Sequence, residues 1–400
     1  MDWSFLIEGK DAMNVTTDSR KVTKDCIFVA LKGEHFDGND FVDQAKAAGA
    51  EYVICGENAL RDLQDLARAW RRELGLPILG ITGTNGKTTT KELCAAVLST
   101  KYKLYYTQGN LNNQIGVPLT LLNITRAHEM AIVEMGASHP GDIRELVEIA
   151  EPDYGLITNV GRAHLQGFGS FEGVMRTKAE LYDFLLAHHG TIFQNEDNPF
   201  LKKMLEDAQQ SIVHCPLSIV HYHTGTMPEG THLVGGYNAE NVSAALCVGE
   251  YFGVSHEDAL AAIRAYVPSN NRSQLMITER NTVVVDAYNA NPTSMQAAIE
   301  AFDRGERRMV NGDCYILGAM RELGEYSHTE HQNIVNMLLE RKADKVLLVG
   351  EEYKQTTAPY PIFDNVEALC DELTRQPLSG WRILLKGSRS NQLEKVIPLL

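Results

Sequence analysis

The apolar run ILGIT (residues 78–82) passes directly into the glycine-rich segment GTNG (residues 83–86), and a helix-like run begins at Lys87. Pro77 ends the preceding helical stretch, and the length of the apolar run is typical of a buried strand. A strand that leads through a tight glycine turn into a helix is the unit from which parallel α/β sheets are built. This unit therefore predicts an α/β fold, with the loop at the carboxyl edge of a sheet.

The same alternation continues along the chain and predicts three domains. In residues 76–268 the strand-like runs are ILGIT, AIVEM, YGLITNV and TIFQN, and the helix-like runs include TTTKELCAAVLST, GDIRELVEIA and NVSAALCVGEYF. Residues 269–400 carry a second set: the strands TVVVDAY, CYILGAM, KVLLVG and RILLKGS alternate with the helices MQAAIEAF, HTEHQNIVNMLLERK and NQLEKVIPLL. Residues 1–75 combine short apolar runs with helices, the last of which is LRDLQDLARAWRREL. We expect an N-terminal α/β domain, a central P-loop domain with a parallel sheet, and a C-terminal Rossmann-like domain.

Charge and cysteine usage exclude several classes of partner. A formal net charge of −15 over 400 residues repels phosphate backbones and anionic lipids, so we expect no nucleic-acid partner. The seven cysteines are scattered, which fits a reducing compartment better than disulfides or a zinc site. No run approaches the roughly 18 apolar residues of a membrane span, and no signal peptide is recognisable at the start. We expect a cytoplasmic protein without membrane insertion.

The GTNGKTT segment has the chemistry of a phosphate-binding loop. Glycines let backbone N–H groups approach phosphate oxygens, Lys87 supplies positive charge, and the Thr88 hydroxyl can bind Mg²⁺ at a helix N-terminus. The general pattern has a glycine where this chain has Ile81, so the match is to the shorter GxxGK[ST] form. The loop predicts nucleotide binding, but a kinase, an ATPase, a ligase and a nucleotide switch all remain possible from it alone.

Longer motifs extend along nearly the whole chain and resemble the Mur ligase family, MurF type. They are TDSR at Thr17, ALKGEHFDGNDFV at Ala30, TGTNGKTT at Thr82, GNLNNQIGVPLTLL at Gly109, VEMGAS at Val133, ITNVGRAHLQGFGS at Ile157, VVVDAYNANPTSMQAAI at Val283, LGAMRELGE at Leu317 and KGSR at Lys386. The MurE type, which adds a single amino acid, usually carries DNPR in the C-terminal domain. Here DNPF occurs instead, at Asp197 in the central domain.

This resemblance implies an ATP- and Mg²⁺-dependent ligase. Its reaction would join D-alanyl-D-alanine to a UDP-N-acetylmuramoyl-tripeptide through an acyl phosphate, in the synthesis of peptidoglycan precursors and hence of the cell wall. Both substrates are small molecules, and a monomer is expected. The alternatives are a MurE-type ligase that adds one amino acid and a non-catalytic nucleotide-binding homologue.

By the same resemblance, three residues are expected to carry the chemistry, namely Lys87, His164 and Lys178. The expected metal ligands are Thr88, Glu134, His164 and Lys178, the last of them as a carbamate. Glu134 ends a predicted strand, where open α/β sheets place their ligands, and an unmodified lysine would repel a metal ion. ATP is expected to bind Gly83, Thr84, Asn85, Gly86, Lys87, Thr88, Thr89, Asn238, Asn241, Arg272, Asp286, Asn289 and Asn291. Because these residues come from two domains, the site should assemble when an open form closes.

The substrate residues that the resemblance implies lie in all three domains. Those for the UDP-sugar peptide are Ser19, Arg20, Lys32, Asn110, Asn112 and Asn113, and those for the dipeptide carboxylate are Lys386 and Arg389. An arginine suits such a carboxylate because it can bind both oxygens. The chain departs from the family pattern at Tyr237, where a histidine is customary, and at Ala319, where aspartate is common.

Overall fold

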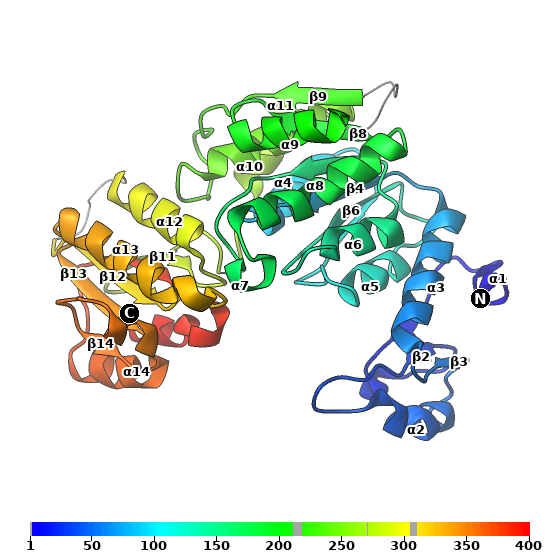
Figure 1. Cartoon of the computed structure of the whole chain (residues 1–400), viewed down its shortest axis with the longest axis horizontal. Coiled ribbons are helices and arrows are strands. Elements are labelled where there is room, and N and C mark those ends of the chain that lie inside the picture. Colours follow the sequence, from blue (N-terminus) through cyan, green and yellow to red (C-terminus); the bar gives the residue numbers. More distant parts are fainter. Residues whose placement is uncertain (1, 211–217, 270, 305–309) are drawn as a thin grey trace.

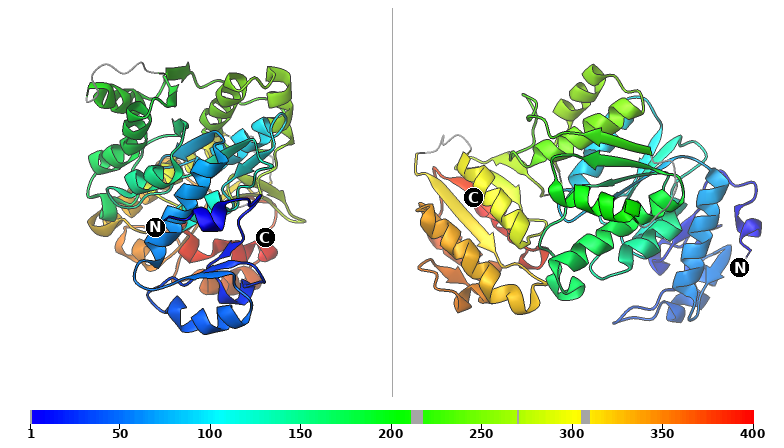
Figure 2. Two further views of the ribbon diagram at one scale, coloured as in Figure 1. Left: turned by 90° about the vertical axis from the view of Figure 1, so that its right-hand side faces the viewer. Right: turned by 45° about the horizontal axis from the view of Figure 1, so that its top comes forward.

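The computed structural model describes residues 2–210, 218–269, 271–304 and 310–400. They form three sheets, and the central sheet lies between the other two in Figure 1 and in the right-hand view of Figure 2. Each sheet falls within one of the three expected domains, whose limits at residues 76 and 268 stay a prediction. Within the described residues, no helix combines the length and the apolar character that a membrane crossing requires. Cys215 lies outside the described residues, and the other six cysteines are free.

The N-terminal part is a small parallel sheet with three helices. The sheet order is β1 (Val15–Thr16), β2 (Ile27–Val29), β3 (Tyr52–Ile54), and the helices are α1 (Ser4–Ile7), α2 (Val42–Ala47) and α3 (Ala59–Leu74). The long helix α3 buries Trp70, whose Nε1 donates to the Ile124 carbonyl at 2.9 Å. Through α3, this part shares a continuous apolar core with the central sheet.

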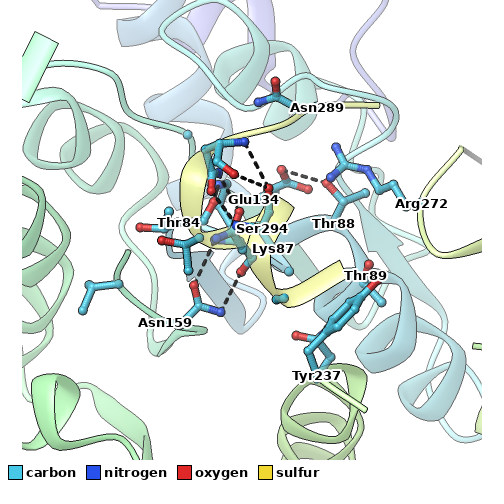
Figure 3. A pocket seen from close by; sticks show the side chains of 18 of the residues that line it. Thr84, Lys87, Thr88, Thr89, Glu134, Asn159, Tyr237, Arg272, Asn289 and Ser294 are labelled. Atoms are coloured by element: carbon cyan, nitrogen blue, oxygen red, sulfur yellow. Dashed lines mark hydrogen bonds between the residues drawn. The ribbon is translucent and has the colours of Figure 1, made fainter. Parts of the chain in front are cut away.

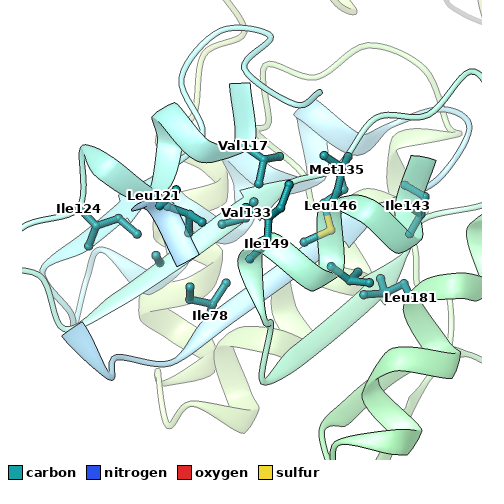
Figure 4. Packing of buried hydrophobic residues seen from close by; sticks show 14 of the residues in the cluster. Ile78, Val117, Leu121, Ile124, Val133, Met135, Ile143, Leu146, Ile149 and Leu181 are labelled. Atoms are coloured by element: carbon teal, nitrogen blue, oxygen red, sulfur yellow. The ribbon is translucent and has the colours of Figure 1, made fainter. Parts of the chain in front are cut away.

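The central sheet has six parallel strands. Its order is β5 (Leu104–Tyr106), β6 (Met130–Glu134), β4 (Ile78–Thr82), β7 (Tyr154–Ile157), β8 (Thr191–Asn195), β9 (Ser218–Tyr222). One face is covered by α5 (Gly116–Leu122), α6 (Asp142–Ala150), α8 (Phe171–Ala187) and α9 (Pro199–Gln210), as Figure 4 shows for part of this core. The other face is covered by α4 (Lys87–Leu98), α10 (Asn238–Tyr251) and α11 (His256–Ala265). The strands β4, β6 and β8 are buried throughout, as expected of a parallel sheet with helices on both faces.

The C-terminal sheet also has six strands, of which the first is antiparallel. Its order is β10 (Gln274–Ile277), β11 (Thr282–Asp286), β15 (Arg382–Lys386), β12 (Asp313–Gly318), β13 (Lys345–Val349), β14 (Ile362–Phe363). The helices α12 (Pro292–Arg304) and α13 (Ser327–Glu340) pack on one face, and α14 (Val366–Arg375) packs on the other. The predicted α/β fold and its Rossmann-like third domain are confirmed.

One predicted helix is not an α-helix. The run NQLEKVIPLL forms 3-10 turns over Leu393–Leu399, because Gln392 has a left-handed backbone (φ 50°) and Pro398 removes a backbone donor.

Candidate active site

The glycine-rich loop joins β4 to α4 at the carboxyl edge of the central sheet. Gly83 and Gly86 have φ values of 143° and 78°, and a Cβ on either would collide with Thr158 or Asn241. Glycine is therefore required at both positions by conformation and by space. The loop places the start of α4, with its free N–H groups, at the edge where ligands of open α/β sheets bind.

A cavity of about 760 Å³ opens over this loop and is lined from both the central and the C-terminal domains. Most of the residues predicted for the site line it: Thr84, Asn85, Gly86, Lys87, Thr88, Thr89, Asn110, Asn112, Asn113, Glu134, His164, Asn238, Asn241, Arg272, Asp286, Asn289, Asn291 and Lys386. Figure 3 shows Lys87, Thr88 and Glu134 side by side within it. The predicted residues outside the cavity lining are Gly83, Lys178, Ser19, Arg20, Lys32 and Arg389.

Lys87 sits at the first position of α4 and turns back over the loop. Its Nζ donates to the carbonyls of Gly83 at 2.8 Å and Thr84 at 3.0 Å. Burial lowers the pKa of Lys87 to about 8, with a smaller lowering from Arg272 and an opposing effect of Glu134. A phosphate group in the cavity would restore the favourable environment of the ammonium by adding negative charge.

Glu134 ends β6 with its side chain almost completely buried, 1% exposed. One carboxylate oxygen accepts hydrogen bonds from Thr88 Oγ1 at 3.2 Å and Asn112 Nδ2 at 2.8 Å. The other oxygen, Oε2, accepts no hydrogen bond from the described residues, and the Lys91 ammonium lies 3.7 Å from it. A buried carboxylate oxygen with spare acceptor capacity beside a threonine hydroxyl fits the oxygen ligands that Mg²⁺ prefers.

Lys178 on α8 is also buried, 2% exposed, and its Nζ lies 5.6 Å from the centre of the Phe168 ring. Burial lowers the pKa of Lys178 well below its ordinary value, and the nearby charge of Lys87 lowers it further. A neutral amine is the form that reacts with carbon dioxide, so this environment fits the expected carbamate. As an unmodified ammonium, Lys178 would not fit a metal site.

His164 begins the short helix α7 (Leu165–Phe168) with a left-handed backbone, φ 50°. Its Nδ1 contacts the carboxylate of Glu322, which comes from the loop after β12 in the C-terminal domain. Burial lowers the pKa of His164, while Glu322 opposes the shift. The neutral imidazole is the form that can bind a metal.

The side-chain amides expected to contact the adenine base of ATP are already hydrogen-bonded within the protein. Asn241 donates to Asn238 Oδ1 at 2.9 Å and accepts from the Thr90 hydroxyl at 3.0 Å, which ties α10 to α4. Tyr237, at the position where the family has histidine, contacts Ser273 Oγ through its hydroxyl at 2.6 Å. Burial raises the pKa of Tyr237, so its hydroxyl stays neutral.

The C-terminal domain contributes a cluster around the ends of β11 and β15. The Arg272 guanidinium lies 3.7 Å from the centre of the Tyr288 ring, and its buried Nε has no hydrogen-bond partner among the described residues. Asp286 pairs with Lys386 Nζ at 2.6 Å. Asn291 Nδ2 donates to Asn85 Oδ1 at 2.8 Å, so the C-terminal domain already contacts the glycine-rich loop. The open arrangement that we expected is therefore not the one in this structure.

Three family descriptions match the chain one after another. They are "Mur ligase family, catalytic domain" over residues 12–86, "Mur ligase middle domain" over residues 81–220 and "Mur ligase, glutamate ligase domain" over residues 271–389. The chain belongs to the Mur ligase family.

Individual Mur ligases are similar over nearly their whole length. The UDP-N-acetylmuramoyl-tripeptide--D-alanyl-D-alanine ligases of Bacillus subtilis and Escherichia coli are 33% and 32% identical, over 96% of this chain and 92% and 93% of theirs. The crystal structure of MurF from Acinetobacter baumannii aligns with a TM-score of 0.84 at 28% identity, covering 96% of this chain and 92% of that one. MurF from Thermotoga maritima in complex with ADP aligns with a TM-score of 0.82 at 28% identity, covering 97% of each chain.

In this Mur ligase, the residues predicted for the UDP-sugar lie in two places. Arg20 and Lys32 pair with Asp18 and Asp37 in the N-terminal domain, and Ser19 precedes Arg20 in the same turn. The three asparagines 110, 112 and 113 line the cavity instead. The Oδ1 atom of Asn113 also accepts from the backbone N–H of Gly116, the first residue of α5, at 2.9 Å. A hydrogen bond from a side chain to the backbone of its own turn therefore explains the asparagine at one of these three positions, 113, without a substrate.

The two residues predicted for the dipeptide carboxylate separate in the structure. Lys386 lines the cavity but pairs with Asp286, which had been predicted for ATP. Arg389 lies outside the cavity lining, with its guanidinium 5.2 Å from the centre of the Tyr288 ring.

Sequence reasoning missed Asn159, Lys91 and Glu322. Asn159 Oδ1 accepts from Asn85 N at 3.0 Å and so holds the loop of this Mur ligase. Its place near the carboxyl end of the predicted strand YGLITNV was a usable signal, since strand ends collect ligand residues. Lys91 was also detectable, one helical turn after Lys87. Glu322 gave no such signal, because its role depends on how two domains meet.

Proposed function

We propose that this Mur ligase joins D-alanyl-D-alanine to UDP-N-acetylmuramoyl-tripeptide in the cytoplasm, as a monomer that uses ATP and Mg²⁺ to form an acyl phosphate on the tripeptide. The observation that carries the proposal is the name shared by relatives that match nearly the full length of this chain at about a third identity. Such extensive similarity includes all three domains, and so it spans the nucleotide loop together with the residues that we propose for the two substrates.

The chemistry follows from the groups around the cavity. Lys87 would hold the β- and γ-phosphates, and Arg272 has a buried donor available for the same charge. Positioning and charge neutralisation are the main contributions that a protein makes to phosphoryl transfer. Mg²⁺ bound by Thr88 and Glu134 would neutralise phosphate charge and orient the transferring group.

The tripeptide carboxylate would attack the γ-phosphate, ADP would leave, and the amine of the dipeptide would then displace phosphate from the acyl phosphate. Water must be kept from this intermediate. The contact between Asn85 and Asn291 and the position of Asp286 would close the C-terminal domain over the nucleotide. Ser19, Arg20 and Lys32 would hold the UDP end of the substrate, away from the reacting carboxylate.

A panel of amine acceptors tests this proposal against the MurE-type alternative. Phosphate release would be measured with ATP, Mg²⁺ and either the UDP-linked tripeptide or a UDP-linked dipeptide, adding D-alanyl-D-alanine, D-alanine or single diamino acids in turn. We expect phosphate release only when D-alanyl-D-alanine is the acceptor and the UDP-linked tripeptide is the other substrate. Equal release with a single amino acid and a UDP-linked dipeptide would favour the alternative, and no acceptor-dependent release would favour a non-catalytic homologue.

A further inference from the structure

The antiparallel strand pair at the edge of the C-terminal sheet brings Arg272 and Tyr288 together. Strand β10 pairs with β11 so that Gln274 lies opposite Val285. Arg272 comes just before β10 begins, and Tyr288 comes just after β11 ends, so both lie at the same end of this pair. The guanidinium carbon of Arg272 lies 3.7 Å from the centre of the Tyr288 ring, over its face. The contact therefore follows from the register of the two strands.

The backbone on both sides of Arg272 is held in an uncommon conformation. Asn271 and Ser273 have φ values of 56° and 48°, in a region that residues other than glycine adopt uncommonly. The buried Ser273 donates its backbone N–H to Asp286 Oδ1 at 3.3 Å, and its hydroxyl contacts the Tyr237 hydroxyl at 2.6 Å. Backbones of this kind persist where the surrounding structure requires them. The base of the Arg272 side chain is therefore fixed, while its direction depends on what the guanidinium contacts.

The Arg272 guanidinium has donor capacity available for a ligand. Its side chain lines the same cavity as Lys87 and Thr88, and Figure 3 draws all three around this pocket. The Nε atom of Arg272 is buried and has no hydrogen-bond partner among the described residues. Buried donors normally have a partner, and two cationic side chains in one cavity favour an anion as that partner.

Arg272 comes from outside the glycine-rich loop, and this decides which phosphate it can reach. The backbone N–H groups of such a loop surround the inner phosphates of a nucleotide. A guanidinium from another segment meets the outermost phosphate, the one that is transferred. Glu134 and Asp286 line the same cavity, and their carboxylates would attract a guanidinium that was free to turn. An arginine that is already oriented also loses less conformational entropy when its ligand binds.

We propose that Tyr288 is a positioning residue, whose ring holds the Arg272 guanidinium toward the terminal phosphate of ATP. The inference rests on the proposed function, because it takes ATP as the ligand of the cavity. Tyr288 lines the cavity together with Arg272. The face of an aromatic ring attracts a cation without neutralising its charge, as a carboxylate would. The ring therefore orients Arg272 and leaves its charge for the phosphate.

The test compares two nucleotides that differ at the terminal phosphate. Isothermal titration calorimetry of the full chain with Mg²⁺ would give the affinities for a non-hydrolysable ATP analogue and for ADP, and their ratio isolates that phosphate. Tyr288→Leu keeps an apolar side chain without an aromatic face and should lower the ratio by about tenfold. Tyr288→Phe keeps the face and should retain the ratio of the parent. An unchanged ratio in Tyr288→Leu, or an equal fall in Tyr288→Phe, would overturn the proposal.

Arg389→Gln is the matched control at the same ring. The exposed Arg389 guanidinium lies 5.2 Å from the centre of the Tyr288 ring. No dipeptide is present in this titration, so removing that charge should leave the ratio of the two affinities unchanged. If Arg389→Gln lowers the ratio as much as Tyr288→Leu does, the effect does not pass through Arg272 and the proposal is overturned.

A second comparison separates positioning from direct contact with the nucleotide. Arg272→Gln should itself lower the ratio, and adding Tyr288→Leu in this background should cause no further loss. A further fall of about tenfold would give the ring a contact of its own and overturn the proposal. Circular dichroism and the thermal midpoint check the fold of each variant. Dipeptide-dependent phosphate release by the parent is measured separately, so failure of the proposed substrate and failure of this positioning role are distinguishable.

Discussion

Lys386 Nζ lies 2.6 Å from Asp286 Oδ2, and the two residues are register partners at the carboxyl ends of β15 and β11. Lys386 is 2% exposed, so its charge depends on this one carboxylate and on the Asn289 carbonyl at 3.2 Å. The pair therefore acts as a unit. Loss of activity after replacing either residue would not by itself assign that residue to ATP or to the dipeptide.

Replacing Asp286 with alanine should lower the free energy of unfolding by about 3 kcal/mol, because it leaves the buried Lys386 ammonium without its counterion. Urea unfolding measures this change. The double variant Asp286→Ala/Lys386→Met should recover most of the stability and remain inactive. A single variant as stable as the parent would mean that the ion pair is not maintained in solution.

Replacing Lys87 with alanine should reduce turnover by about 10²-fold or more, the usual cost of removing a group that stabilises transition-state charge. The fold should survive, because the hydrogen bonds of Lys87 Nζ within the described part of the chain go to carbonyls of its own loop. Circular dichroism and the thermal midpoint check the fold. Lys203→Ala, an exposed change on α9, is the control and should keep full activity. Turnover near that of the parent would remove Lys87 from the mechanism.

Replacing Lys178 with alanine should abolish activity, and short carboxylates or high bicarbonate should restore part of it by supplying the missing oxygen ligand. The reason is the low pKa that burial and Lys87 impose on Lys178, which leaves a neutral amine for carbamate formation. Initial rates with increasing acetate measure the rescue. The same carboxylates should not rescue Lys87→Ala. A Lys178→Ala variant as active as the parent would refute the carbamate role.

His331 should make the stability of the C-terminal domain depend on pH. It is fully buried, its Nδ1 donates to the Ser327 carbonyl at 2.7 Å, and its Nε2 accepts from Met320 N at 3.0 Å. Burial lowers its pKa below the unfolded value of 6.5, so the unfolded state binds the proton first. Stability is therefore complete above about pH 6.5 and falls as the pH decreases below it.

Urea unfolding at about pH 7.5, 6.5 and 5.5, on either side of the unfolded pKa, measures this dependence. Replacing His331 with glutamine, which cannot be protonated, should flatten the decrease on the acid side. His256→Asn, at an exposed position at the start of α11, should leave it unchanged. Equal acid sensitivity in all three proteins would assign the effect to other groups.

The sequence predicted those parts of the site that follow from local pattern. Glu134 was found because a strand end in a parallel sheet is a ligand position, and Lys87 because its loop has a fixed spacing. The pairing of Asn85 with Asn291 and of His164 with Glu322 could not be predicted, because it depends on contacts between domains that no periodicity encodes. The last predicted helical stretch, NQLEKVIPLL, forms a 3-10 helix rather than an α-helix, and Pro398 was the residue that could have indicated this.

The most direct test of the ligase mechanism follows the oxygen atoms of the tripeptide. The UDP-linked tripeptide would carry ¹⁸O in the terminal carboxylate, and product and phosphate would be analysed by mass spectrometry after reaction with ATP and D-alanyl-D-alanine. Activation by phosphorylation predicts one ¹⁸O atom in the released phosphate for each amide bond formed. Unlabelled phosphate in the presence of the ligated product would contradict the acyl phosphate and with it the central claim.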